Sequence, residues 1–343
     1  MFEIPLWAWA ATIALIVALF VFDLLVAVRR PHAVGLREAA FWSAFYIAVA
    51  LLFGVAVLAV AGGTAGTEYF AGWIVEKSLS VDNLFVFVII MARFEVPARY
   101  QQKVLLFGIA AALLLRSVFI AIGAAAISAF SFTFLLFGLV LIWTAVQLMR
   151  HRNEDPDIED NWLVRRSRAL MPTTTDFHGG RMFAREDGRR VMTPLVLVLI
   201  AVGSTDLLFA LDSIPAVFGV TSEPFLVFTA NAFALMGLRA LFFLIEGLLE
   251  RLVYLSVGLS LILAFIGVKL ILLFLHEDVD RAFPEIPTPL SLLVILLILV
   301  VTTAASILRV RKHPEERAHA GTLRMRKRDE ETKDTATEPR TSA

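Results

Sequence analysis

Two copies of one acidic motif, Ser-x-Asp-x-Leu-Phe, lie in strongly apolar surroundings at Ser80–Phe85 and Ser204–Phe209. Each copy places a carboxylate, Asp82 or Asp206, near the middle of an apolar stretch. An ionisable side chain at the centre of a membrane helix costs about 2.5–3.5 kcal/mol on insertion scales, so such residues are usually functional. The chemistry that these motifs indicate is the binding of a cation, or the transfer of a proton, inside a membrane.

The first copy has further oxygen donors close by in the sequence. Glu76 and Asn83 are seven residues apart, which returns to the same helix face within about 20°. Ser80 lies between them, four residues after Glu76. One face of a helix would therefore carry a carboxylate, a hydroxyl and an amide, with Asp82 alongside.

The second copy repeats part of this pattern. Asp206 and Ser213 have the same seven-residue spacing, and Asp212 lies about 9 Å from Asp206 along a helix axis at 1.5 Å per residue. Pro215 has no N–H, which leaves the carbonyl of Leu211 without its helical donor. A freed carbonyl beside carboxylates is typical of sites for hard cations.

Two other polar residues are weaker candidates. Asn231 offers an amide oxygen in the next apolar stretch, although a residue that packs helices together explains it equally well. Asp23 is either a pathway acid or a helix-end charge near Arg29. Oxygen donors favour Mg²⁺, Ca²⁺ or Mn²⁺ over softer metals, and a proton relay stays open. The predicted metal-handling residues are Glu76, Asp82, Asn83, Asp206, Asp212, Asn231 and Asp23.

Basic residues also lie inside the apolar stretches. Arg116 follows Asp82 by 34 residues and Arg239 follows Asp206 by 33, so the repeat extends beyond the motifs. We expect Arg116, Arg239 and Lys269 to position or balance the acids. The alternative is that all these charges only neutralise one another. The sequence next to the first motif also contains Lys77, whose ammonium could snorkel to the outer surface.

The elements that must position these residues are membrane-spanning helices. The chain is 59% hydrophobic and 18% charged, with a mean hydropathy of +0.78, values beyond those of soluble domains. We predict an all-α polytopic membrane protein, because apolar stretches of about twenty residues recur about nine times. The predicted spans are Leu6–Val28, Ala39–Val60, Phe70–Ala92, Val104–Ile127, Phe130–Met149, Pro194–Val220, Phe225–Ile245, Leu252–Leu275 and Pro289–Leu308.

Loop charges predict the orientation. Under the positive-inside rule, basic loops are cytoplasmic. We therefore expect the protein in the inner (plasma) membrane, with its N-terminus outside and its C-terminus in the cytoplasm. The third to fifth spans and the sixth to eighth then form an inverted three-helix repeat, with a site expected at the midplane. The basic residues that carry this prediction are Arg29, Arg30, Arg37, Arg93, Arg99, Lys103, Arg165, Arg166, Arg168, Arg189 and Arg190.

The chain divides into a transmembrane domain at residues 1–310 and a tail at 311–343. Residues 150–193 form a cytosolic loop within that domain, in which Asp187 and Gly188 predict a small hairpin. The tail is rich in charged residues without an apolar period, so we expect it to be disordered.

Several functional classes are disfavoured. The absence of Cys removes disulfides and thiolate ligands, and no His lies in the middle of a span. Paired intramembrane Asp residues can serve hydrolysis, but Gly203–Asp206 departs from the Gly-x-Gly-Asp pattern of the corresponding proteases. We therefore expect no enzymatic activity, no bound cofactor and no nucleic-acid partner.

Three longer stretches, Glu76–Asn83, Phe209–Ala216 and Asn231–Ala240, resemble the TerC/Alx family of integral membrane proteins. The resemblance covers roughly Trp9 to Arg309. It implies a bacterial inner-membrane protein of a family linked to tellurium resistance, with members that export Mn²⁺ or help to supply it to secreted enzymes. It also implies that the acids at positions 76, 82, 206 and 212 handle the metal. Many relatives carry Glu where this chain has Gly203.

The sequence thus predicts a manganese transporter for metal ion efflux, with the lipid bilayer and a divalent metal ion as partners. The alternative is an accessory protein that assists metallation or secretion of exported proteins without net transport. Secretion or metallation proteins and a second copy of the chain are further partner classes that this interpretation allows.

Overall fold

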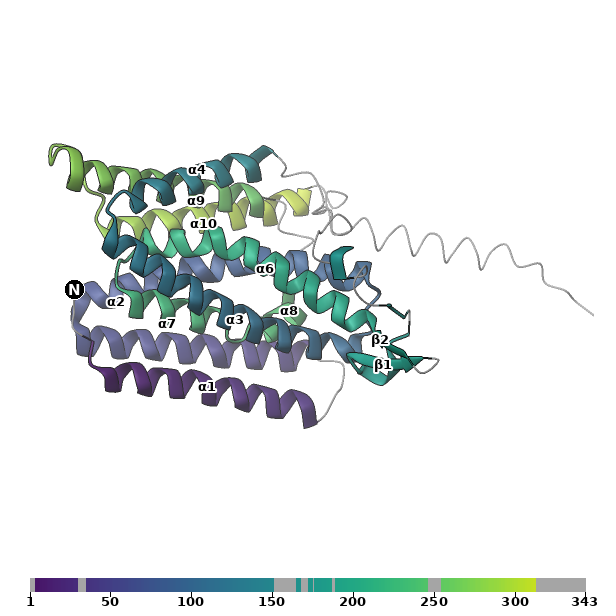
Figure 1. Cartoon of the computed structure of the whole chain (residues 1–343). Helices are drawn as coiled ribbons and strands as arrows, with labels where there is room; N and C mark the ends of the chain where they lie inside the picture. The colour runs from purple at the N-terminus through teal and green to yellow at the C-terminus, as the bar shows by residue number, and fades with distance from the viewer. Residues whose placement is uncertain are drawn as a thin grey trace, which may run out of the picture.

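Long apolar helices run side by side between two ends of the molecule (Figure 1). The computed structural model describes residues 4–29, 35–150, 165–167, 172–174, 176–186, 189–245 and 254–312. Of the tail predicted at 311–343, Arg311 and Lys312 are helical, whereas 313–343 lie outside these ranges, as does much of the loop at 150–193.

The helices, in chain order, are α1 (Leu6–Arg29), α2 (Leu36–Arg93), α3 (Ala98–Ala129), α4 (Thr133–Arg150), α6 (Pro194–Phe218), α7 (Pro224–Leu235), α8 (Leu238–Ile245), α9 (Leu255–Phe274) and α10 (Thr288–Lys312). Four short elements complete the described structure: the 3₁₀ turn η1 (His178–Gly180), the strands β1 (Phe183–Glu186) and β2 (Arg189–Met192), and the π-helical turn η3 (Leu275–Val279).

Helix α2 is a helical hairpin of 58 residues. Gly62 has φ +91°, a backbone conformation that glycine adopts readily, and the chain reverses there. The Tyr69 hydroxyl donates to the carbonyl of Ala50 over 3.0 Å. In a straight helix these residues, 19 apart, would be separated by about 28 Å. Helix α2 therefore has a first limb, residues 36–61, and a second limb, residues 63–93.

The helical segments account for the predicted spans. Seven helices are long and apolar enough to cross a membrane, and the bent pair α7 and α8 forms an eighth segment with a 40° bend. Because α2 consists of two limbs, the described part of the chain contains nine apolar segments. The prediction of an all-α polytopic membrane protein is confirmed. The predicted spans Ala39–Val60 and Phe70–Ala92 leave a connection of nine residues, which is longer than the observed one, since only Gly62 leaves the helical conformation.

The two predicted repeats pack against each other reciprocally. The second limb of α2, α3 and α4 form one unit, and α6, α7–α8 and α9 form the other. Helix α2 packs against α7 and α8, α3 against α6, and α4 against α9. A Cβ on Gly138 would lie 2.8 Å from the Gly267 carbonyl oxygen, and a Cβ on Gly267 would lie 2.8 Å from that of Gly138. This reciprocity is the packing that a two-fold relation between the units requires.

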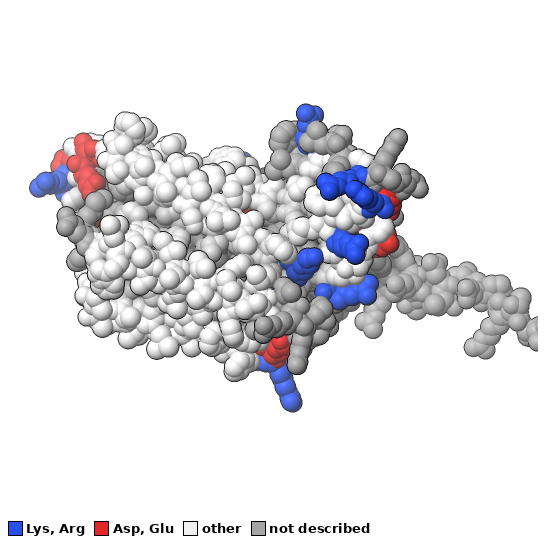
Figure 2. All heavy atoms as spheres, turned by 60° about the horizontal axis from the view of Figure 1, so that its bottom comes forward, with Lys and Arg blue, Asp and Glu red and all other residues white. Residues whose placement is uncertain are grey.

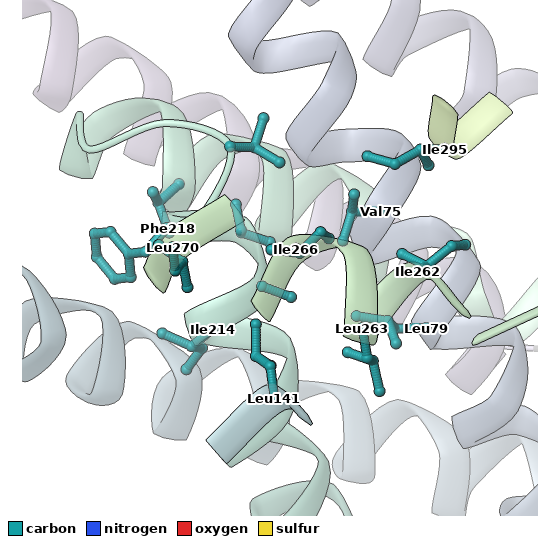
Figure 3. Close-up of a cluster of buried hydrophobic side chains, with 14 of the residues drawn as sticks. Val75, Leu79, Leu141, Ile214, Phe218, Ile262, Leu263, Ile266, Leu270 and Ile295 are labelled. Atoms are coloured by element: carbon teal, nitrogen blue, oxygen red, sulfur yellow. The ribbon is translucent and has the colours of Figure 1, made fainter. Parts of the chain in front are cut away.

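Apolar side chains fill the junction between the units, where α9 packs against α2, α4, α6 and α10. Figure 3 shows part of this cluster. Burial of each large aliphatic side chain contributes roughly 1.5–3 kcal/mol relative to exposure in water. The junction is consequently a rigid scaffold for the polar groups beside it. Its labelled members are Val75, Leu79, Leu141, Ile214, Phe218, Ile262, Leu263, Ile266, Leu270 and Ile295.

A small β-hairpin is attached to one end of the bundle. Strands β1 and β2 pair antiparallel on either side of residues 187–188, the position at which the sequence predicts the turn. Phe177 stacks on Tyr100 of α3, with ring centroids 5.9 Å apart. The Lys103 ammonium donates to the carbonyl of Gly180 over 2.7 Å. The hairpin therefore sits on the start of α3.

Exposed charged side chains gather at the two ends, whereas the charged groups in the middle, such as Glu76 and Arg116, are buried. Figure 2 shows a white middle and a concentration of Lys and Arg at the end that carries the hairpin. The opposite end carries acids together with a basic residue. This distribution leaves an apolar belt around the middle of the molecule, as expected of a surface that faces lipid.

Candidate functional site

A buried guanidinium joins the two repeats at the centre of the molecule. Arg116 of α3 is 0% exposed and forms an ion pair with Glu76, which is on the second limb of α2 and is also 0% exposed. It also binds Asp206 of α6 through two nitrogens, with Nη2–Oδ1 at 3.0 Å and Nε–Oδ2 at 3.3 Å. One carboxylate from each repeat therefore converges on the same cation.

Two neutral oxygens complete the surroundings of Arg116. Its Nη1 lies 3.3 Å from Ser213 Oγ, which shares a face of α6 with Asp206. The side-chain amide of Asn83, oriented to satisfy its neighbours, accepts from Arg116 Nη2 at 2.9 Å and donates to the Leu79 carbonyl at 3.1 Å. All three nitrogens of the guanidinium thus have partners.

Other polar atoms next to this cluster lack partners. Glu76 Oε2, Ser80 Oγ and both side-chain atoms of Asn231 are buried without a hydrogen bond among the described residues. Asn231 belongs to α7 and lies next to Glu76. A buried polar atom without a partner costs about 1–3 kcal/mol, so these groups mark a position suited to a ligand or to water.

Asp212 lies outside the Arg116 cluster, although the sequence predicted one shared site. Six residues of helix rotate the side chain by about 120° relative to Asp206, towards α4 rather than α3. There Asp212 accepts from the Thr144 hydroxyl at 2.8 Å. It lines a cavity of about 330 Å³ together with Asn83, Thr144 and Gln147, so Asn83 borders both the cavity and the Arg116 cluster.

Asp23 belongs to a second buried ion pair. Arg239 Nη2 of α8 lies 2.6 Å from Asp23 Oδ1 of α1, and Arg239 Nη1 lies 3.2 Å from Gln102 Oε1 of α3. Lys269 is buried on α9 and forms no ion pair with a described carboxylate. The structure therefore distributes the predicted residues over separate places. The Asp82 backbone is helical within α2, while its side chain lies outside the described part of the chain.

The prediction that the Lys77 ammonium could snorkel to the outer surface is wrong. The ammonium donates to the carbonyl of Ala234 at 3.0 Å, inside the bundle. Helix α7 ends at Leu235, which leaves the Ala234 carbonyl without a helical donor and available to Lys77. Sequence reasoning also missed Gln102 and Thr144, whose polar side chains in apolar helices are the signal that could have found them.

These features define a class: a polytopic membrane protein in which inverted helical repeats enclose buried ion pairs. The family model of the "Integral membrane protein TerC family" matches residues 61–314. The chain belongs to the TerC family of integral membrane proteins, which confirms the resemblance seen in the sequence.

Relatives from distant organisms extend this match. "Uncharacterized membrane protein Rv2723" of Mycobacterium tuberculosis is 48% identical over 310 residues, which cover 87% of this chain and 78% of the relative. "Putative membrane-bound redox modulator Alx" of Escherichia coli is 38% identical over 303 residues, 86% and 92% of the two chains. "Thylakoid membrane protein TERC, chloroplastic" of Arabidopsis thaliana is 40% identical over 255 residues, 74% and 66%. No solved structure matches.

Proposed function

We propose that this protein exports a divalent cation, with Mn²⁺ as the favoured substrate. The observation that carries the proposal is the convergence of Glu76 and Asp206, one from each repeat, on the buried Arg116. Two carboxylates and one guanidinium have a formal charge of −2 + 1 = −1. A buried excess of negative charge attracts a further cation, because burial of an unpaired charge is costly.

Arg116 acts in this proposal as a built-in counter-ion. When the guanidinium moves aside, a cation of charge +2 neutralises both Glu76 and Asp206. Asn83, Ser213 and the unpartnered hydroxyl of Ser80 then supply neutral oxygens. This donor set is hard and contains no sulfur, which suits Mn²⁺, Mg²⁺ or Ca²⁺.

In this proposal, the replacement of the Arg116 guanidinium by a metal ion requires a movement of the two repeats. Among the described residues, no three His, Asp or Glu side chains converge closely enough to hold a metal ion. A substrate therefore binds only after the units shift relative to each other, as in transporters with inverted repeats. The contact of Gly138 with Gly267 offers a narrow pivot, because the α4 and α9 backbones meet there without intervening side chains.

Orientation follows from charge. We place the chain in the inner membrane with its N-terminus outside and its C-terminus in the cytoplasm. In support, the exposed basic residues at the hairpin end include Arg93, Arg99, Arg150, Arg309 and Arg311. The opposite end carries Glu277, Asp278, Asp280, Arg281 and Glu285.

An accessory role without net transport is the second candidate. This role is favoured because Arg116 already binds Glu76 and Asp206 and neutralises part of their charge. The name redox modulator that Alx relatives carry fits a role outside transport as well. Partners in metallation or secretion of exported proteins would then bind the ends of the bundle.

A growth assay tests the site. Cells that lack their own Mn²⁺ exporters should survive excess Mn²⁺ when they express the wild type, and should lose this protection with Asp206→Asn. Asp280→Asn, a change of the same chemistry at an exposed residue, should keep it. Full protection by a normally expressed Asp206→Asn variant would refute the role given to this carboxylate.

A further inference from the structure

We propose that the C-terminal end of α7 is a separate binding position for a monovalent cation, and that the Lys77 ammonium fills it as a tethered cation. This position lies beside the Arg116 cluster but uses different atoms. The Lys77 ammonium is held there by its own side chain, whether or not the protein transports Mn²⁺.

A break in the seventh apolar segment creates the position. Met236 has ψ 135° and Gly237 has φ +78°, so the helix stops and restarts with a bend of 40°. A Cβ on Gly237 would lie 2.7 Å from the Tyr46 Cβ. Tyr46 of the first limb of α2 therefore packs directly on the break, and only glycine fits there in this conformation.

The end of α7 concentrates negative potential. The last carbonyls of a helix have no intrahelical donors, and the helix dipole adds a partial charge of about −0.5 at this end. Broken helices in membrane transporters use such ends to coordinate cations. Here the Ala234 carbonyl oxygen lies 3.0 Å from Lys77 Nζ.

The Lys77 ammonium contacts a backbone carbonyl, in the manner of a bound cation. No described carboxylate forms an ion pair with it, although its neighbour Glu76 pairs with Arg116. Successive residues on a helix point about 100° apart, so Glu76 faces α3 while Lys77 faces α7. The charge of Lys77 is therefore stabilised by the carbonyl and the helix end.

Asn231 adds a buried neutral side chain one helical turn before Ala234. It lies three residues before Ala234, on the same face of α7, and is 1% exposed. Both polar atoms of its side chain lack hydrogen-bond partners among the described residues. The amide oxygen of Asn231 and the carbonyl of Ala234 are neutral ligands. Together with the helix dipole they suit a monovalent cation better than a divalent one.

Removal of the tether should expose the position to Na⁺ or K⁺. The test compares the melting temperature of the detergent-solubilised full chain in NaCl, KCl and choline chloride at equal ionic strength. Lys77→Ala should melt several degrees higher in NaCl or KCl than in choline chloride, with saturation. The wild type and Lys77→Arg, whose cations stay in place, should show no such difference. Lys269→Ala, which removes another buried Lys, is the matched control and should show none.

A melting temperature of Lys77→Ala that is equal in all three salts would overturn the proposal. If this variant folds in choline chloride only poorly, recovery of monodisperse protein in NaCl or KCl supports it, and equal aggregation in every salt contradicts it. The readout contains no Mn²⁺, so this result is independent of whether the protein exports a divalent cation.

Discussion

Replacement of Arg116 by Met should remove the positive centre of the buried cluster while it keeps most of the side-chain volume. Glu76 and Asp206 would then be buried without their shared cation, since each is at most 1% exposed. Removing one partner of a buried ion pair costs about 3–5 kcal/mol. At about 2–4 °C per kcal/mol for large domains, the melting temperature should fall by roughly 6–20 °C.

Intrinsic fluorescence of the six Trp residues can follow this unfolding in detergent. Arg311→Gln, which removes an exposed Arg, should leave the melting temperature unchanged. Mn²⁺ should stabilise Arg116→Met more than the wild type, because the metal replaces the missing guanidinium; saturation at a hundredfold excess over Kd adds about 2.7 kcal/mol. The reasoning is refuted if Arg116→Met is as stable as the wild type, or if Glu76→Gln and Asp206→Asn fail to relieve its instability.

Three further predictions concern other contacts. Asp23→Asn should destabilise the protein by about 3–5 kcal/mol, because it removes the carboxylate that neutralises the buried Arg239; a loss below 1 kcal/mol in fluorescence-detected unfolding would contradict this. Gly267→Val should lower the melting temperature because its side chain would meet the Gly138 carbonyl at 2.8 Å, whereas Gly63→Val, where nothing lies within 4 Å, is the control; equal effects would disprove the close contact. Hydrogen bonds from Thr174 and His178 hold the pKa of Glu186 below its usual 4.5, so the carboxylate stabilises the hairpin above that pH and this contribution is lost as the pH falls through the folded pKa. Thr174→Ala should therefore raise the pKa of Glu186 in an NMR titration, and an unchanged value would count against the bond.

The segments of the fold were predictable because hydropathy and length are local properties of the chain. Every predicted span overlaps a helical segment, and the described Lys and Arg side chains concentrate at one end (Figure 2). The break at Met236 and Gly237 was not predictable from mean hydropathy, because the predicted span Phe225–Ile245 runs through it. The break depends on the contact of Gly237 with Tyr46, and these two residues lie far apart in the sequence.

The residue types of the candidate site were also predictable, since ionisable side chains are rare inside apolar spans. Their grouping was not. Asp206 and Asp212 share one helix, but its rotation directs the first to Arg116 and the second to Thr144. Likewise, the choice of Asp23 as the partner of Arg239 depends on how α1 packs against the repeats. Sequence spacing within one helix contains no information about such contacts.

Flux of ⁵⁴Mn²⁺ through the purified protein tests the central claim most directly. Liposomes that contain the wild type should exchange internal ⁵⁴Mn²⁺ for external Mn²⁺ well above protein-free liposomes. Asp206→Asn should abolish this exchange, and Asp280→Asn should preserve it. Folded wild-type protein that moves no ⁵⁴Mn²⁺, together with binding of a protein partner, would contradict export and favour the accessory role.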